Sequence, residues 1–249
     1  MTNETQHLAG EAPCIKPLGD GAATVVFGAT MAPEIHARVR GLDAALGAAH
    51  HPAISEWAPA FASLTVWYDP DMLGFDALAD LLLRLSASAA PAPAGAAWAL
   101  PFCCDADFAP DLADTAAQKG LSPEAYIDAF CGLTFEAIML GFLPGFAYLG
   151  GLPEALSPPR LTTPRVKVPA RSVAVADGMC AAYPFESPGG WRLIGRTPAP
   201  LFDARNAERP VLIAPGDRLR WRRVTRKEFL TLEARWAQNF DAASLREAP

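Results

Sequence analysis

The sequence predicts an α+β N-terminal domain followed by a mainly β domain. Before residue 86, periodic hydrophobic segments follow one another in the order β-α-β-β-α. The stretch 86–95 (SASAAPAPAG) is almost pure Ala, Pro, Ser and Gly, which is typical of a linker. After residue 140, many short extended runs are separated by Pro and Gly, a pattern that favours an antiparallel barrel or sandwich. We therefore expect two domains, at residues 1–92 and 93–249.

Each element of the N-terminal domain has its own hydrophobic period. Residues 18–27 are expected to be extended, with an interruption at Gly-Asp-Gly. Pro33 begins a helix, and strands are expected over 54–57 and 61–68. A second helix follows. The expected buried faces of the two helices are Ile35, Val39, Leu42 and Leu46, and Phe75, Leu78, Leu82 and Leu85. This order is that of a split βαβ sandwich.

The C-terminal domain begins with a strand over 98–103 and two short helices. The first helix covers 110–119, and the second begins with Ser122 as N-cap and a proline at its first position. A capping box, Thr225 to Glu228, starts a closing helix. Between these helices the expected strands are 134–140, 172–176, 191–194, 210–213 and 218–224.

Composition limits the classes of function. With 51% hydrophobic and 19% charged residues, the 249-residue chain can bury a proper core. The net charge of −6 hides a basic block, because residues 160–226 hold thirteen Arg and Lys against five Asp and Glu. This block favours an anionic ligand, an acidic partner or a solvated face. Nucleic acid is disfavoured as a partner, since the arginines are scattered among Pro and Gly loops without a recognisable binding module.

Cysteine and histidine usage narrows the chemistry. The five cysteines are an odd number without C-x-x-C, which indicates reduced thiols. All four histidines lie within the first 51 residues, so a Ser-His-Asp or Cys-His site confined to the later part is excluded. We expect neither a secretory signal peptide nor a membrane span, and hence a soluble cytoplasmic protein.

Three loops carry the candidate ligand-binding residues. Loop 141–153 (GFLPGFAYLGGLP) combines glycines with aromatic side chains, including Phe146. Loop 159–172 sets cations among stiffening prolines, and loop 183–198 has a Ser-Pro-Gly-Gly turn that could form an anion-binding nest. The alternative interpretations are a packed structural turn for the first loop and exposed edge arginines for the second.

Together these loops resemble one family. The succession GFLPGFAYLGGLP, PR…PRVKVPA-x-SVAVA, YPFESPGGWRLIGRTP and PGD is similar to the B subunit of prokaryotic 5-oxoprolinase. The same family includes allophanate hydrolase subunit 1 and the Kip-type inhibitors of a sporulation histidine kinase. The resemblance spans residues 18–224 and implies that the second domain is a cyclophilin-like β-barrel.

The resemblance implies ATP-dependent opening of 5-oxoproline to glutamate, with partner subunits C and A. It implies that ATP, with Mg, is shared with these partners. We expect no metal site, and neither nucleic acid nor a membrane as a partner. The alternatives are a Kip-type kinase regulator and an allophanate hydrolase subunit. The expected catalytic residues are Asp107 and Ser172. The expected substrate- or phosphate-binding residues are Phe146, Arg160, Arg165, Lys167, Ser187, Gly189, Gly190, Trp191 and Arg196.

Some positions depart from the family pattern. Arg171 and Asp177 stand where the family usually has glycine. Cys180 stands where it usually has threonine, and Phe130 where it often has histidine. The segment 104–107 (CDAD) replaces Tyr-Gly-Gly-Glu. We expect the Arg171 side chain to pair with Asp177 and to obstruct the ligand pocket. The alternative is that Arg171 has been recruited to clamp an anion.

Overall fold

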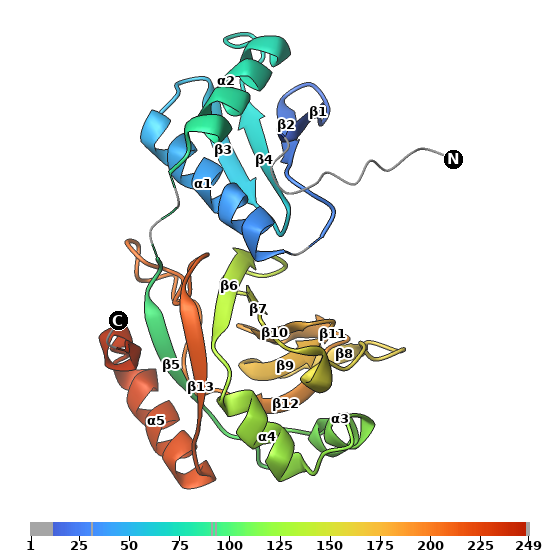
Figure 1. The fold of residues 1–249 in the computed structure, drawn as a ribbon. Helices are drawn as coiled ribbons and strands as arrows, with labels where there is room; N and C mark the ends of the chain where they lie inside the picture. The colour runs from blue at the N-terminus through green and yellow to red at the C-terminus, as the bar shows by residue number, and fades with distance from the viewer. Residues whose placement is uncertain (1–11, 31, 91, 93, 248–249) are drawn as a thin grey trace. The chain divides into compact units, whose positions relative to one another are not determined.

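The computed structural model describes residues 12–30, 32–90, 92 and 94–247. The chain divides into two compact units, residues 1–93 and 94–249, and each has its own hydrophobic core (Figure 1). The first unit is α+β and the second is a mainly β barrel, so the fold class predicted from the sequence is confirmed.

The first unit is a four-stranded antiparallel sheet packed against two helices. Its strands lie in the order β1-β2-β4-β3. Because β2 and β3 both pair antiparallel with β4, they run parallel to each other on either side of it, as in a split βαβ unit. The helices bury Val39, Leu42 and Leu78 against Leu64 and Val66 of β4. The elements are β1 (Cys14–Pro17), β2 (Ala22–Val26), α1 (Pro33–Ala49), β3 (Ile54–Pro59), β4 (Ser63–Tyr68) and α2 (Phe75–Ser88). The first residues of the expected linker are therefore still helical.

The second unit is built on a seven-stranded sheet in the order β12-β9-β10-β7-β6-β13-β5. All neighbours pair antiparallel except β13 and β5, which run parallel. A separate ribbon joins β8 to β11. The elements are β5 (Ala97–Phe102), α3 (Leu112–Gln118), α4 (Pro123–Cys131), β6 (Phe135–Leu140), β7 (Ala147–Gly150), η1 (Glu154–Leu156), β8 (Arg165–Val168), β9 (Ser172–Ala176), β10 (Met179–Ala182), β11 (Ser187–Gly189), β12 (Arg192–Arg196), β13 (Arg218–Arg223), α5 (Arg226–Gln238) and η2 (Ala242–Leu245).

One bridge joins the two edge strands of this sheet. Cys103, directly after β5, exchanges two backbone hydrogen bonds with Arg196 of β12, with N···O distances of 2.8 and 2.9 Å. The neighbouring Gly195 allows this approach, since a Cβ there would lie 2.5 Å from the Phe102 ring and 2.8 Å from the Cys103 carbonyl oxygen. The sheet is thereby closed into a barrel around an apolar core.

Both expected helix caps are present, and one expected strand is not. The Ser122 hydroxyl accepts from the Ala125 amide at 3.1 Å, and the Thr225 hydroxyl accepts from the Glu228 amide at 3.2 Å. The strand expected over 210–213 is wrong, because that segment makes only an isolated bridge between Val211 and Phe202. Leu212 and Ile213 are buried although the segment forms no ladder, so the hydrophobic run reports burial and not strand formation.

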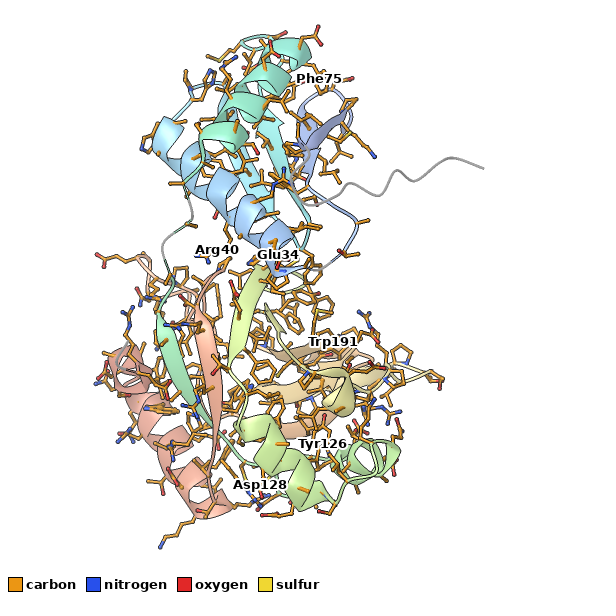
Figure 2. All side chains as sticks on the ribbon, viewed as in Figure 1. Glu34, Arg40, Phe75, Tyr126, Asp128 and Trp191 are labelled. Atoms are coloured by element: carbon orange, nitrogen blue, oxygen red, sulfur yellow. The ribbon has the colours of Figure 1, made fainter. Side chains whose placement is uncertain are left out.

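Helix α4 fixes the segment that leads to the ligand pockets. Tyr126 on α4 is fully buried and donates its hydroxyl proton to the Leu156 carbonyl oxygen at 2.6 Å (Figure 2). This bond anchors η1 just before residue 160.

None of the described helices is long and apolar enough to cross a bilayer.

Candidate functional site

Two pockets of the second unit hold most of the candidate residues. The first, here called the aromatic pocket, has a volume of about 280 Å³ and is lined by Phe142, Phe146, Tyr148, Arg160, Pro164, Tyr183, Pro188, Gly189, Gly190 and Trp191. The second, here called the cationic pocket, has a volume of about 200 Å³ and is lined by Asp107, Phe108, Pro110, Arg165, Lys167, Pro169, Ser172, Leu193 and Arg196. The β8–β11 ribbon contributes residues to both.

Five rings pack edge to face in the aromatic pocket, and the Phe142 ring centroid lies 5.4 Å from that of Phe146. The Phe146 ring centroid lies 4.9 Å from that of Tyr148, 5.2 Å from that of Tyr183 and 6.2 Å from that of Trp191. Gly145 makes the preceding turn at φ +81°, and a Cβ there would lie 2.8 Å from the Leu201 carbonyl oxygen. The glycine is therefore required to bring the Phe146 ring into place.

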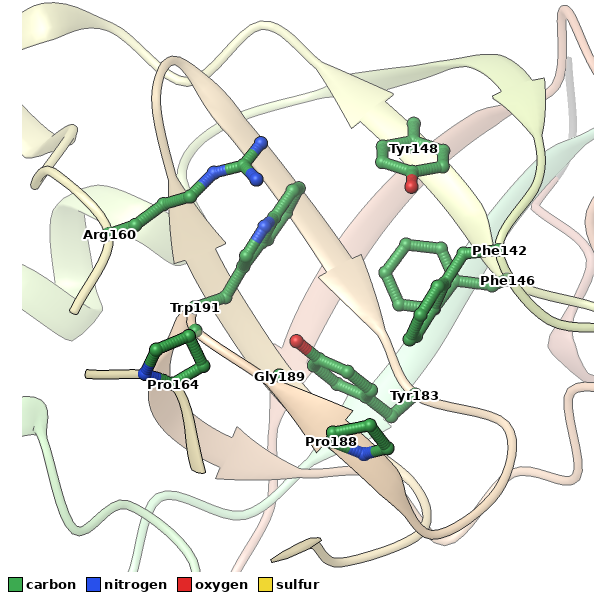
Figure 3. Close-up of a pocket in the computed structure, with 10 residues that line it drawn as sticks. Phe142, Phe146, Tyr148, Arg160, Pro164, Tyr183, Pro188, Gly189 and Trp191 are labelled. Atoms are coloured by element: carbon green, nitrogen blue, oxygen red, sulfur yellow. The ribbon is translucent and has the colours of Figure 1, made fainter. Parts of the chain in front are cut away.

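Arg160 is the cation of the aromatic pocket. Its guanidinium carbon lies 5.8 Å from the Trp191 ring centroid, and Figure 3 shows the two side chains next to each other. The Arg160 Nε also donates to Asp177 at 2.7 Å, with both side chains about half exposed. An exposed pair of this kind is weak, so the guanidinium can turn to a ligand at little cost.

Two tyrosine hydroxyls point into the same space (Figure 3). Burial raises the pKa of Tyr183 to about 12 and also raises the pKa of Tyr148. Both phenols are therefore neutral at physiological pH and can donate a proton in a hydrogen bond. The Trp191 backbone amide donates to the Tyr183 oxygen, and a Cβ on Gly189 would lie 2.4 Å from it. Glycine at position 189 thus leaves room for the Tyr183 hydroxyl.

The cationic pocket is organised by a buried carboxylate. Asp111 is only 8% exposed, and its carboxylate accepts from Arg165 at 2.5 Å and from the Leu193 amide at 2.7 Å. Arg196 donates its Nε proton to the Ala170 carbonyl oxygen at 2.9 Å, and its guanidinium carbon lies 5.5 Å from the Phe108 ring centroid. Ser172 is buried at the start of β9, where it pairs with Arg196 across the sheet.

The exposed residues of the cationic pocket are tied to surface partners. Lys167 pairs with Glu186 at 2.9 Å, and the Lys167 side chain is 75% exposed. Asp107 pairs with Arg226 at 3.1 Å, and the Asp107 side chain is 76% exposed. Lys167 and Asp107 are thus both solvated and paired at the surface.

The structure divides the expected site residues between the two pockets. Phe146, Arg160, Gly189, Gly190 and Trp191 line the aromatic pocket, while Asp107, Arg165, Lys167, Ser172 and Arg196 line the cationic pocket. Ser187 lines neither. Its hydroxyl is buried and has no hydrogen-bond partner within the described residues.

The sequence alone does not single out Tyr148, Tyr183, Phe108 or Asp111. The two tyrosines stand in loops that are notable for their glycines and cations, so loop position is the available signal for them. Asp111 precedes helix α3 but makes no cap with its side chain. Its partner Arg165 lies 54 residues later, and no local pattern connects them.

The expected placement of Arg171 is wrong. Its guanidinium pairs with Glu233 of α5 at 2.5 Å and donates to the Pro198 carbonyl oxygen at 3.1 Å. Asp177 pairs instead with Arg160. Arg171 lines neither pocket and so obstructs neither. Both Arg171 and Asp177 have positive φ, at 66° and 48°, which gives a conformational reason for glycine at these positions.

Metal ligands are not gathered in the part of the chain that is described. No group of three or more His, Cys, Asp or Glu side chains there could hold a metal ion.

The comparisons with known proteins agree on one family. The family model of the carboxyltransferase domain, subdomain C and D, matches residues 13–213. The B subunit of 5-oxoprolinase from Bacillus subtilis (strain 168) is 34% identical over 227 residues, which cover 86% of this chain and 94% of that protein.

Solved structures extend the likeness to the fold. The crystal structure of TTHA0988 is similar with a TM-score of 0.73 and 33% identity, over 82% of this chain and 40% of that one. This chain thus spans less than half of TTHA0988. The K. lactis urea amidolyase has a TM-score of 0.75 at 17% identity, over 88% of this chain and 15% of that one, which shows a shared fold.

Proposed function

Because the chain belongs to the family of the carboxyltransferase domain, subdomains C and D, we propose that it is a subunit of an ATP-dependent amide hydrolase that opens 5-oxoproline to glutamate. The B. subtilis relative, which is named as the B subunit of 5-oxoprolinase, supports this proposal. A protein named as one lettered subunit works with others, and we propose subunits C and A as the partners here.

The observation that carries the proposal is the composition of the aromatic pocket. 5-Oxoproline is a small flat ring with one carboxylate, one amide N–H and one amide oxygen. The pocket offers ring faces and edges, the Arg160 guanidinium for the carboxylate, and the neutral hydroxyls of Tyr148 and Tyr183 for the amide oxygen. Its volume of about 280 Å³ lies near the lower end of small-molecule pockets, roughly 300–1,000 Å³.

These residues also suit the reaction. A cyclic amide is a poor electrophile because resonance stabilises it, so its oxygen has to be activated before the carbonyl carbon is attacked. Two preorganised phenol donors would position that oxygen and stabilise the negative charge of the phosphoryl group that it receives. Arg160 would hold the carboxylate and so orient the ring relative to these donors.

ATP supplies the activation in this proposal: the amide oxygen takes the terminal phosphoryl group and ADP leaves. Water then attacks the carbonyl carbon, the C–N bond of the ring breaks to give an acyl phosphate, and a second water releases glutamate and inorganic phosphate. A pocket of about 200 Å³, such as the cationic pocket, fits a phosphoryl group but is small for a whole nucleotide, against about 300–1,000 Å³ for typical ligand pockets. We therefore propose that the nucleotide and its Mg are bound together with the partner subunits.

Reconstitution tests the proposal. The chain is co-expressed with subunits C and A, and 5-oxoproline-dependent ATP hydrolysis is measured for the complex and for the lone chain. We expect turnover only in the complex, and a loss of about tenfold or more in kcat/KM for Arg160→Ala, because a charge-assisted contact is removed.

The matched control is Arg205→Ala. Arg205 also pairs with an aspartate, Asp203 at 2.8 Å, but it lies outside both pockets. This variant should keep the activity of the complex. Turnover by the lone chain, or equal activity of the Arg160 and Arg205 variants, would contradict the proposal. Binding of 5-oxoproline without turnover in the complete complex would favour the regulatory alternative.

A further inference from the structure

The charges around the cationic pocket are not balanced at Arg196. Arg165 is paired with Asp111, and Lys167 is paired with Glu186. Within the described residues, no carboxylate forms an ion pair with Arg196, whose Nε is bound to a backbone carbonyl oxygen. Arg196 is thus the cation of this pocket whose charge remains unneutralised by a direct partner.

The surroundings of Arg196 make that charge costly. Its side chain is partly buried against the Phe108 ring. Burial lowers the pKa of Arg196, and the positive charge of the nearby Arg171 lowers it further, with Glu233 acting in the opposite direction. A partly desolvated site with excess positive charge attracts an anion, since the anion relieves both effects.

Further donors face the same pocket. Ser172 lies directly opposite Arg196 in the β9–β12 ladder, and both residues line the pocket. The NH1 group of Arg165 is buried and has no hydrogen-bond partner in the described part of the chain. Two guanidinium groups and one hydroxyl therefore approach one space from two strands and a ribbon. Several donors converging from different directions suit an anion with several oxygens.

We propose that the cationic pocket is a second binding site, specific for a phosphate-type oxoanion and independent of the aromatic pocket. The volume of about 200 Å³ fits one phosphate or phosphoryl group. The anion is either free phosphate or the terminal phosphoryl group of a nucleotide. The inference does not depend on 5-oxoproline being the substrate, because that proposal rests on the other pocket.

To test this phosphate site, inorganic phosphate is titrated into the purified full chain, and binding is measured by calorimetry and by ³¹P NMR. We expect saturable binding that weakens at high ionic strength. Arg196→Gln should weaken it by about tenfold or more, and Ser172→Ala by a smaller factor. Arg192→Gln is the matched control, since Arg192 lies on the same strand but lines neither pocket. It should leave phosphate affinity unchanged.

Two further arms separate the ligand sources and the two pockets. If ATP displaces phosphate and shows the same dependence on Arg196, the anion is a nucleotide phosphoryl group; if it does not, the anion is free phosphate. Binding of 5-oxoproline, followed by saturation-transfer NMR, should be lost in Arg160→Ala and kept in Arg196→Gln.

The proposal is overturned if wild-type protein shows no saturable phosphate binding, or if Arg196→Gln and Ser172→Ala both bind like wild type. Thermal unfolding followed by circular dichroism shows whether Arg196→Gln remains folded. If that variant unfolds, Ser172→Ala alone decides. Loss of 5-oxoproline binding with phosphate binding intact would count against the proposed function and not against this site.

Discussion

Arg171 combines an unfavourable backbone conformation with a stabilising side-chain contact. Its φ of 66° is a conformation in which a Cβ is costly, yet its side chain joins the turn before β9 to helix α5 through Glu233. The sequence alone suggested that this arginine would enter the ligand pocket. It could not show otherwise, because the partner Glu233 lies 62 residues away and is reached only in the folded barrel.

Two substitutions at this position should separate the strain from the contact. Arg171→Ala keeps the positive φ and loses the ion pair, so we expect unfolding to become easier by about 1–2 kcal/mol. Arg171→Gly loses the same pair but relieves the strain, and it should be more stable than the alanine variant by about 1 kcal/mol. Urea denaturation measures both. Equal stability of the two variants would show that the backbone at residue 171 carries no strain.

Tyr183 gives a pH dependence with a defined sign. Its pKa is about 12 in the folded protein and ordinarily about 10, so the folded state holds its proton more tightly. The contribution of this tighter proton binding to the free energy of unfolding is fully present below about pH 10 and is lost as the pH rises through about 12. We expect Tyr183→Phe to lose less stability than wild type over that interval, measured by denaturation at successive pH values. Parallel curves for the two proteins would exclude this role for Tyr183.

At the scale of elements, the sequence predicted those features that depend on contacts between residues close together in the chain. Ser122 and Thr225 cap their helices as expected, since an N-cap bonds an amide only three residues away. The strand at Ser172–Ala176 was also predicted, from its β-branched and small apolar residues between turn signals. The expected strand over 210–213 failed because an apolar run records burial, and Leu212 and Ile213 are buried without a partner strand. For the same reason the sequence could not divide the candidate residues of these loops between two pockets.

The closure between β5 and β12 depends on Gly195. A Cβ at this position would meet the Phe102 ring and a backbone oxygen, and the latter cannot move without breaking the bridge. We expect Gly195→Ala to destabilise the second unit by about 1–3 kcal/mol, as overpacking does. Gly190→Ala is the control, because its Cβ would make an ordinary contact of 3.6 Å with Pro164. Thermal unfolding should change little for it. Similar losses in both variants would contradict the explanation.

At the scale of the whole molecule, the sequence predicted two domains joined near residues 86–95. The chain divides into units 1–93 and 94–249, and α2 ends at Ser88, so the segment between the units is short and rich in Ala and Pro. Composition made this visible because such a segment has little apolar surface to bury. The fold class followed from the alternation of elements, whereas the choice of a cyclophilin-like barrel came from the family resemblance.

Limited proteolysis tests the domain division. Elastase, which cleaves after small residues, should cut first between residues 89 and 95 and leave a stable fragment that begins near Trp98. Mass spectrometry identifies the fragment, and circular dichroism shows whether it keeps its β structure. First cleavage within residues 159–198, with the junction intact, would contradict the prediction.

The bridge between Cys103 and Arg196 is also a place where the barrel can open locally. It is held by two reciprocal backbone hydrogen bonds, whereas β5 pairs with β13 over six residue positions. Opening at this bridge therefore breaks fewer backbone hydrogen bonds than separating β5 from β13, and the amide protons of Cys103 and Arg196 should exchange with solvent before those in the β5–β13 ladder. Since the Arg196 side chain lines the cationic pocket, an anion bound there would stabilise this bridge and slow the hydrogen exchange of both amide protons.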